Sequence, residues 1–238
     1  MSKSSKQENV WLNLGFNIAA PSLLLIKGRS IFEYFCAPAE GVDIWIFIAA
    51  LSFPLVYGIY DLIDRKKWNI FSVIGLLSVL LTGGIGLMKL SRECMIVKET
   101  AVPLVLGVAV LATAFTKRPL AKMIMLNDDV VDVKRIDEAL DARNARNEYD
   151  SSLRGATYWV AASFLLSAFL NFFLASYIFR SEPGTEAFNE EVGKMTAMSF
   201  PVIVIPTTVV FIFAMYKFFA SLTKCTGLKL DEIIAQKK

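Results

Sequence analysis

Six long apolar blocks run through this sequence and constrain its fold more than any other feature. Each block is 17 to 25 residues long and contains no Asp, Glu, Lys or Arg. A helix needs about 17–25 such residues to cross the hydrocarbon core of a bilayer. The blocks are Asn9–Ile26, Ile44–Tyr60, Trp68–Met88, Thr100–Thr116, Gly155–Phe179 and Met195–Tyr216. We therefore predict an all-α polytopic membrane protein with six transmembrane helices.

The composition excludes an ordinary soluble domain. Hydrophobic residues make up 55% of the chain and charged residues 20%, whereas soluble proteins have about 45–50% and about 25%. The order of the blocks predicts three segments. Residues 1–126 hold transmembrane helices one to four and a short interfacial stretch, 127–153 form a cytoplasmic helical loop, and 154–238 hold helices five and six with the C-terminal tail.

The distribution of basic residues predicts the orientation. The two tails and the segments after the second and fourth blocks hold 18 of the 25 Lys and Arg residues. Because short cytoplasmic loops carry an excess of Lys and Arg, both termini are expected in the cytoplasm. The net charge of +3 then reflects topology, and we expect lipid rather than nucleic acid as the partner.

The residue inventory excludes several classes of catalytic and binding site. The chain has no histidine, its three cysteines are far apart, and it lacks both glycine-rich nucleotide motifs. Imidazole bases, His-ligated metals and clustered Cys sites are therefore excluded. We predict no enzyme activity, no cofactor and no metal centre.

Polar side chains inside the apolar blocks are the candidates for a hydrated path between helices. In lipid, amides, hydroxyls and carboxyls turn towards the bundle interior. Asp61 could carry protons or cations, or could sit in the interface. Glu99 could coordinate an ion at a helix end, or could interact with the helix dipole. The candidates are Asn13, Asn17, Tyr57, Asp61, Glu99, Ser163, Ser167 and Asn171; dry packing would explain the amides and hydroxyls equally well.

Small residues in the third block favour close helix packing, within the chain or in a homo-oligomer. A row of small residues lets helix backbones approach in lipid, and here it comprises Ser78, Thr82, Gly83, Gly84 and Gly86. Cys36 and Cys94 fall in two predicted external loops and could form a disulfide, whereas Cys225 is predicted to be internal.

Two charged segments complete the prediction. In residues 127–153, Val133, Ile136 and Leu140 recur at helical spacing. Preceding carboxylates could cap a helix or, less specifically, bind a cation; they are Asp128, Asp129 and Asp132. Residues 180–194 are predicted to form an acidic external loop.

Several stretches resemble one bacterial family of six-helix inner-membrane proteins that carry a transporter-like label. They are FPLVYGIYDLIDRKKWNIFSVIGLLSVLLTGGIGLMKL, KETAVPL, TKRPL and PGTEAFNEEVGKMTAMSFPVI. The first half is also distantly similar to intracellular septation protein A, an inner-membrane protein linked with division and envelope integrity. The resemblance marks Asp61, Gly83, Gly84, Glu99 and Pro103 as motif positions.

Two functions follow from the residues and the resemblance. The first is a small-solute or ion transporter or channel with a polar path between helices. The alternative is a non-enzymatic envelope scaffold that resembles the septation protein and holds partners through charged loops or a dimer face.

Overall fold

The computed structural model describes residues 14–36, 40–65, 70–116, 119–126 and 131–234. For residues 61–65 and 70–76 it describes the backbone alone. Within these ranges the regular structure is helical, apart from one isolated antiparallel bridge between Val131 and Ile234. The predicted all-α class is confirmed for the described residues.

Four helical stretches in the described residues are long and apolar enough to cross a membrane. They are Val42–Tyr60, Arg92–Phe115, Arg146–Ile178 and Glu186–Thr226. They correspond to the second, fourth, fifth and sixth predicted blocks. The first block overlaps the π-helical turn η1 (Gly15–Ala19) and α2 (Ala20–Phe35), and the third overlaps α4 (Ile70–Leu87).

The candidate spans begin earlier than the apolar blocks. α5 (Arg92–Ala112) begins eight residues before Thr100 and is followed by a 3₁₀ turn, η2 (Thr113–Phe115). α8 (Arg146–Ile178) begins nine residues before Gly155. An apolar block ends at the first charged residue. The helix continues through that residue, because it depends on backbone hydrogen bonds and not on side-chain hydropathy.

The prediction of a loop over residues 180–194 is wrong in its second half. α9 (Glu186–Ser199) starts there and continues through the π-helical turn η3 (Phe200–Val204) into α10 (Ile205–Thr226). The Thr185 hydroxyl caps α9 by accepting a hydrogen bond from the Phe188 N–H at 3.2 Å. This side-chain cap satisfies one of the free N–H groups of the first turn, so the acidic segment is helical.

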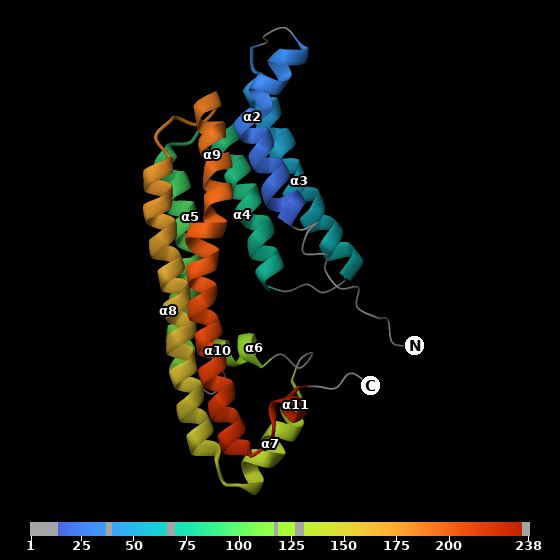
Figure 1. Cartoon of the computed structure of the whole chain (residues 1–238). Coiled ribbons are helices and arrows are strands. Elements are labelled where there is room, and N and C mark those ends of the chain that lie inside the picture. The colour runs from blue at the N-terminus through green and yellow to red at the C-terminus, as the bar shows by residue number, and fades with distance from the viewer. Residues whose placement is uncertain (1–13, 37–39, 66–69, 117–118, 127–130, 235–238) are drawn as a thin grey trace. The chain divides into compact units, whose positions relative to one another are not determined.

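The chain divides into two compact units. Unit 1 comprises Met1–Val102 and Leu170–Ile203, and unit 2 comprises Pro103–Phe169 and Val204–Lys238. In unit 1, α2 packs against α9 and against α3 (Val42–Arg65), and α3 packs against α4 (Figure 1).

The core of unit 1 is aromatic and tightly packed. The Phe188 ring centroid lies 6.2 Å from that of Phe47 and 5.9 Å from that of Phe179. Gly193 of α9 meets α2 so closely that a Cβ there would lie 3.0 Å from the Ser22 carbonyl oxygen. A side chain at position 193 would therefore push the two helices apart.

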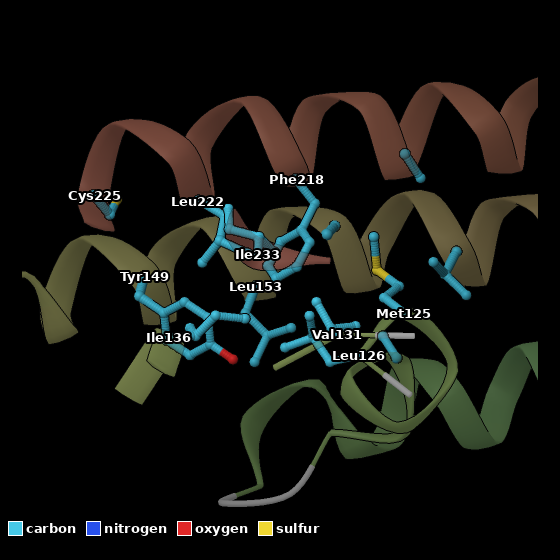
Figure 2. Close-up of a cluster of buried hydrophobic side chains, with 14 of the residues drawn as sticks. Met125, Leu126, Val131, Ile136, Tyr149, Leu153, Phe218, Leu222, Cys225 and Ile233 are labelled. Atoms are coloured by element: carbon cyan, nitrogen blue, oxygen red, sulfur yellow. The ribbon is translucent and has the colours of Figure 1, made fainter. Parts of the chain in front are cut away.

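Unit 2 is built on α8 and α10, which run side by side in opposite directions (Figures 1 and 2). One end of this pair is covered by Leu120–Leu126, Val131–Ala145 and Leu228–Ile234, which we call the end module. The module contains α6 (Leu120–Met125), α7 (Val133–Ala142) and α11 (Leu230–Ile233). Figure 2 shows the apolar core that the module shares with α8 and α10, which includes Met125, Leu126, Val131, Ile136, Tyr149, Leu153, Phe218, Leu222, Cys225 and Ile233.

Backbone and ionic contacts join the distant segments of the end module. The Asp132 N–H donates to the Ile233 carbonyl at 2.9 Å, beside the bridge between Val131 and Ile234. Arg135 forms an ion pair with Glu232 at 2.7 Å. Residues about a hundred positions apart thus share one small core.

The helix predicted within residues 127–153 is present, and one of the three carboxylates expected to cap it does so. Asp132 caps α7 by accepting from the Arg135 N–H at 3.1 Å, whereas Asp128 and Asp129 lie outside the described residues. Ile136 and Leu140 are buried as predicted, and Val133 is half-buried.

The junction between α7 and α8 is held by charge. Arg146 donates two hydrogen bonds to the Asp141 carboxylate, at 2.6 and 2.8 Å. This hydrogen bonding lowers the pKa of the Asp141 carboxyl below its ordinary value. The two helices are therefore joined by an ion pair as well as by a short turn.

Gly227 ends α10 in the left-handed conformation, with φ of 69°. The Arg143 guanidinium occupies the space that a Cβ would need. Gly227→Ala should therefore lower the free energy of unfolding by about 1–3 kcal/mol, measured by SDS titration in mixed micelles. The control is Gly155→Ala, because no other group lies within 4 Å of a Cβ there. Equal stability changes in the two variants would contradict this account.

Candidate functional site

A lysine lies inside one of the four candidate membrane spans and is nearly buried. Lys98 of α5 has a side chain that is 8% exposed, and Glu99 beside it is 22% exposed. The Lys98 ammonium lies 2.6 Å from Glu99 Oε1 and donates to the Thr82 hydroxyl of α4 at 2.8 Å. One ion pair and one hydroxyl therefore hold the charge between two helices.

Thr82 passes the hydrogen bonding back to its own helix. Its hydroxyl donates to the Ser78 carbonyl at 3.0 Å while it accepts from Lys98. These two hydrogen bonds connect the Lys98 ammonium to the Thr82 hydroxyl and the Thr82 hydroxyl to the Ser78 carbonyl. Removing any charge from water is costly unless it is paired and hydrogen-bonded, and this arrangement supplies both kinds of partner.

The backbone beside the pair is also polar. Lys98 lies six residues after Arg92, the first residue of α5. At 1.5 Å per residue, it is therefore about 9 Å from the start of the helix. Pro103 has no N–H, so the Glu99 carbonyl cannot accept the usual helical hydrogen bond from that position. The site therefore combines an ammonium, a carboxylate, a hydroxyl and a carbonyl without a helical partner from Pro103.

Only part of the predicted polar path is gathered at this site. Glu99 was predicted as a path residue and Thr82 as a packing residue, whereas the sequence interpretation did not select Lys98. The Lys98 side chain was missed because the fourth apolar block begins at Thr100, which left Lys98 as a flanking charge.

The candidates of the first two helices lie elsewhere in unit 1. Asn17 is half-buried in η1. The Phe16 ring stacks on the Tyr57 ring with centroids 6.1 Å apart. Both rings line a largely apolar groove of about 530 Å³. Asn13 and the Asp61 side chain lie outside the described residues.

The predicted row on α8 is divided between the two units. Ser163 is buried and donates to the Val160 carbonyl at 2.7 Å within the same helix. Ser163 and Ser167 belong to unit 2, whereas the buried Asn171 belongs to unit 1 with Glu99. The structure therefore does not describe one site that contains the whole predicted set.

The predicted packing row makes close contacts at selected positions. A Cβ at Gly86 would overlap the Phe47 ring of α3, and one at Gly83 would lie 3.4 Å from the Leu51 side chain. Around Gly84 no group lies within 4 Å of a Cβ position. Close approach thus occurs at Gly86 but not along the whole row.

The structure holds the cysteines of the predicted disulfide as separate thiols. Cys36 and Cys94 are both free and exposed, and Cys225 is free and buried. Cys36 ends α2 in an extended conformation. Cys94 lies in the first turn of α5, where its sulfur is 3.7 Å from the Ser91 hydroxyl.

A second charged cluster joins three helix ends in unit 1, and the sequence interpretation missed it. Arg29 of α2 lies 2.6 Å from Asp43 of α3, 2.9 Å from Glu33 and 3.3 Å from Glu186 of α9. Asn189 of α9 donates to the Asp43 carbonyl at 2.8 Å. The Arg29 side chain is 31% exposed, so we assign this cluster a structural role.

Within the described residues, no group of three or more His, Cys, Asp or Glu side chains could hold a metal ion. The chain matches no family model, and comparisons with curated proteins and with solved structures find no match.

Proposed function

We propose that this chain is a six-span inner-membrane protein with both termini in the cytoplasm, and that it transports a small solute or ion. The observation that carries the proposal is the Lys98–Glu99 pair, with Lys98 nearly buried and Glu99 half-buried, in a helix long enough to span a membrane. Ionisable residues within membrane spans are costly and commonly mark ion or substrate pathways. The transporter-like resemblance belongs to the same proposal and depends on the sequence stretches quoted above.

The pair can exchange partners without leaving a buried charge alone. A small anion would bind Lys98 while a cation or proton binds Glu99, so neither group is left as an unpaired charge. Thr82 would keep its hydrogen bond to the ammonium with or without the solute. This exchange would lower the cost of binding and releasing a charged solute in an apolar span.

Access of water to Thr82 tests the proposal without a guess about the substrate. In a chain without its three native cysteines, Thr82→Cys and Ser78→Cys would be treated with a membrane-impermeant thiol reagent from each side. We expect Thr82→Cys to react faster than Ser78→Cys, and only from the predicted external side. Both variants leave Lys98 and Glu99 intact.

Two control variants separate a hydrated path from general reactivity. Ala50 is 0% exposed in the apolar core of unit 1, and Val97 is 64% exposed beside Lys98. Ala50→Cys in dry protein and Val97→Cys in lipid should both stay unlabelled. If Thr82→Cys and Ser78→Cys also stay unlabelled from both sides, a hydrated path at Lys98 is wrong.

One observation favours the alternative, a non-enzymatic envelope scaffold. The end module is a packed structure with exposed charges, including Lys134, Arg135 and Glu138. Such a surface is suited to holding a protein partner. Thiols at positions 78 and 82 that never react would favour this function over transport.

A further inference from the structure

A groove of about 590 Å³ lies between α8 and α10 in unit 2. Its lining is mixed, with three hydroxyls, an amide, one cation, one carboxylate and an indole. The residues are Asn147, Glu148, Ser151, Ser152, Gly155, Ala156, Trp159, Lys217, Phe218 and Ser221. All belong to one unit, so the groove is a local property of this helix pair.

Contacts at its two ends give the order of groups along the groove. At one end the Trp159 and Phe213 rings meet edge to face, with centroids 4.9 Å apart. At the other end the Cys225 thiol lies 3.8 Å from a Glu148 carboxylate oxygen. Trp159 and Glu148 are about 16 Å apart along the helix axis, at 1.5 Å per residue.

The groups between these ends follow a chemical sequence. Because the helices are antiparallel, Lys217 and Ser221 of α10 lie between the two contacts, as do Ser151, Ser152 and Gly155 of α8. Lys217 is nearer the aromatic end, the hydroxyls follow, and Glu148 is at the far end. The groove thus runs from aromatic to cationic, then to hydroxyl and finally to anionic.

The charged groups at the groove have hydrogen-bonding capacity left for a ligand. The Lys217 ammonium lies 5.3 Å above the Phe213 ring and forms no ion pair with any residue that the structure describes. Among the described residues, Glu148 accepts a hydrogen bond only from the Cys225 thiol, and this bond is weak. An anion near Lys217 and a cation near Glu148 would each gain a charge-assisted contact.

Aromatic residues mark the level of the groove relative to a membrane. Tyr158, Trp159, Phe213 and Tyr216 are 44%, 41%, 42% and 71% exposed, respectively. Tyr and Trp prefer the headgroup level of a bilayer. The aromatic end of the groove would therefore lie at the headgroup level, and its polar length would extend from there towards the end module.

We propose that this groove binds the headgroup of phosphatidylethanolamine in the leaflet next to the end module. The lipid phosphate lies beside the serine hydroxyls, between Lys217 and Glu148, and its primary ammonium, two carbons further along, lies beside Glu148. The inference depends on the membrane placement of α8 and α10 proposed above, but not on transport. A choline headgroup has no N–H to donate to Glu148, and a glycerol headgroup offers Glu148 no cation.

Gly155 leaves space for this ligand and supplies the sharpest test. No group lies within 4 Å of a Cβ at this position, so Gly155→Leu should fill the groove without disturbing the fold. Gly84 is equally open in α4 of unit 1, which makes Gly84→Leu the matched control. Lys217→Met removes the cation and keeps most of the side-chain length.

Lipid binding to the purified, delipidated full chain would be measured by native mass spectrometry with three lipids. The wild type should bind phosphatidylethanolamine about tenfold more tightly than phosphatidylcholine or phosphatidylglycerol, the effect of one charge-assisted hydrogen bond. Gly155→Leu and Lys217→Met should each weaken this binding about tenfold, and Gly84→Leu should not. Glu148→Gln should abolish the preference for the ethanolamine headgroup over choline.

Several outcomes would overturn the proposal. Equal binding of phosphatidylethanolamine and phosphatidylcholine to the wild type would show that Glu148 does not select the ethanolamine headgroup. A preference for phosphatidylglycerol would indicate a simple anion site. Soluble phosphoethanolamine that competes as well as the lipid would indicate a free phosphate ester. Unchanged binding by both folded groove variants would place the lipid elsewhere, whatever the thiol experiment at Thr82 shows.

Discussion

Lys98→Met should lower the free energy of unfolding by about 2–4 kcal/mol, because it leaves Glu99 as an unpaired carboxylate in an apolar span. The Lys98 side chain is 8% exposed and that of Glu99 22%, so water replaces the lost partner only in part. The Thr82 hydroxyl also loses the donor that it accepts from at 2.8 Å. SDS titration of the purified protein in mixed micelles would measure the change.

A matched ion pair provides the control for this prediction. Lys194 pairs with Glu190 at 2.9 Å, but these side chains are 52% and 38% exposed. Lys194→Met should therefore cost about 0.2–1 kcal/mol, as for other exposed pairs. The double variant Lys98→Met with Glu99→Gln should recover part of the loss, because the unpaired charge is gone. A cost at Lys98 no larger than at Lys194 would show that the buried pair has no special energetic role.

Gly193→Leu should be the most damaging substitution in the core of unit 1. A Cβ at Gly193 would lie 3.0 Å from the Ser22 carbonyl oxygen and 2.9 Å from the Leu25 Cβ. Backbone atoms cannot move aside as a flexible side chain can, so α2 and α9 must separate. Overpacking of this kind costs about 3 kcal/mol or more at the upper end of its range. The same SDS titration would measure the loss.

Gly84→Leu separates this packing effect from the general effect of replacing a helical glycine. Gly84 also lies inside a helix, but no group occupies the space around it. Replacing a helical glycine removes a penalty of about 1 kcal/mol, so Gly84→Leu should be neutral or stabilising. If both leucine variants unfold alike, the close approach at Gly193 is not what stabilises this helix pair.

Four of the six apolar blocks correspond to candidate spans of the described residues, but the helix ends were predicted poorly. Hydropathy detects residues that suit lipid, so the second block matched α3 closely. It could not detect that Arg92 and Arg146 begin helices, because charges at helix ends depend on partners that are distant in sequence. Arg92, for example, donates a hydrogen bond to the Arg180 carbonyl, 88 residues later in the sequence, at 3.1 Å.

The candidate site was only partly predictable for the same reason. Glu99 stood out as a carboxylate at an apolar boundary, but Lys98 looked like an ordinary flanking charge. Its importance depends on Thr82, sixteen residues earlier on another helix. No spacing within one helix relates these two residues, so only the packing of α4 against α5 brings them together.

The order of synthesis gives the end module a further consequence. Val131 and Asp132 make backbone contacts with Ile233 and Ile234, which the ribosome adds about a hundred residues later. Chains are made from the N-terminus, so Val131, Ile136 and Leu140 lack part of their core until α10 and α11 exist. A nascent chain stopped before Lys229 would keep apolar surface of α7 open to water and to chaperones.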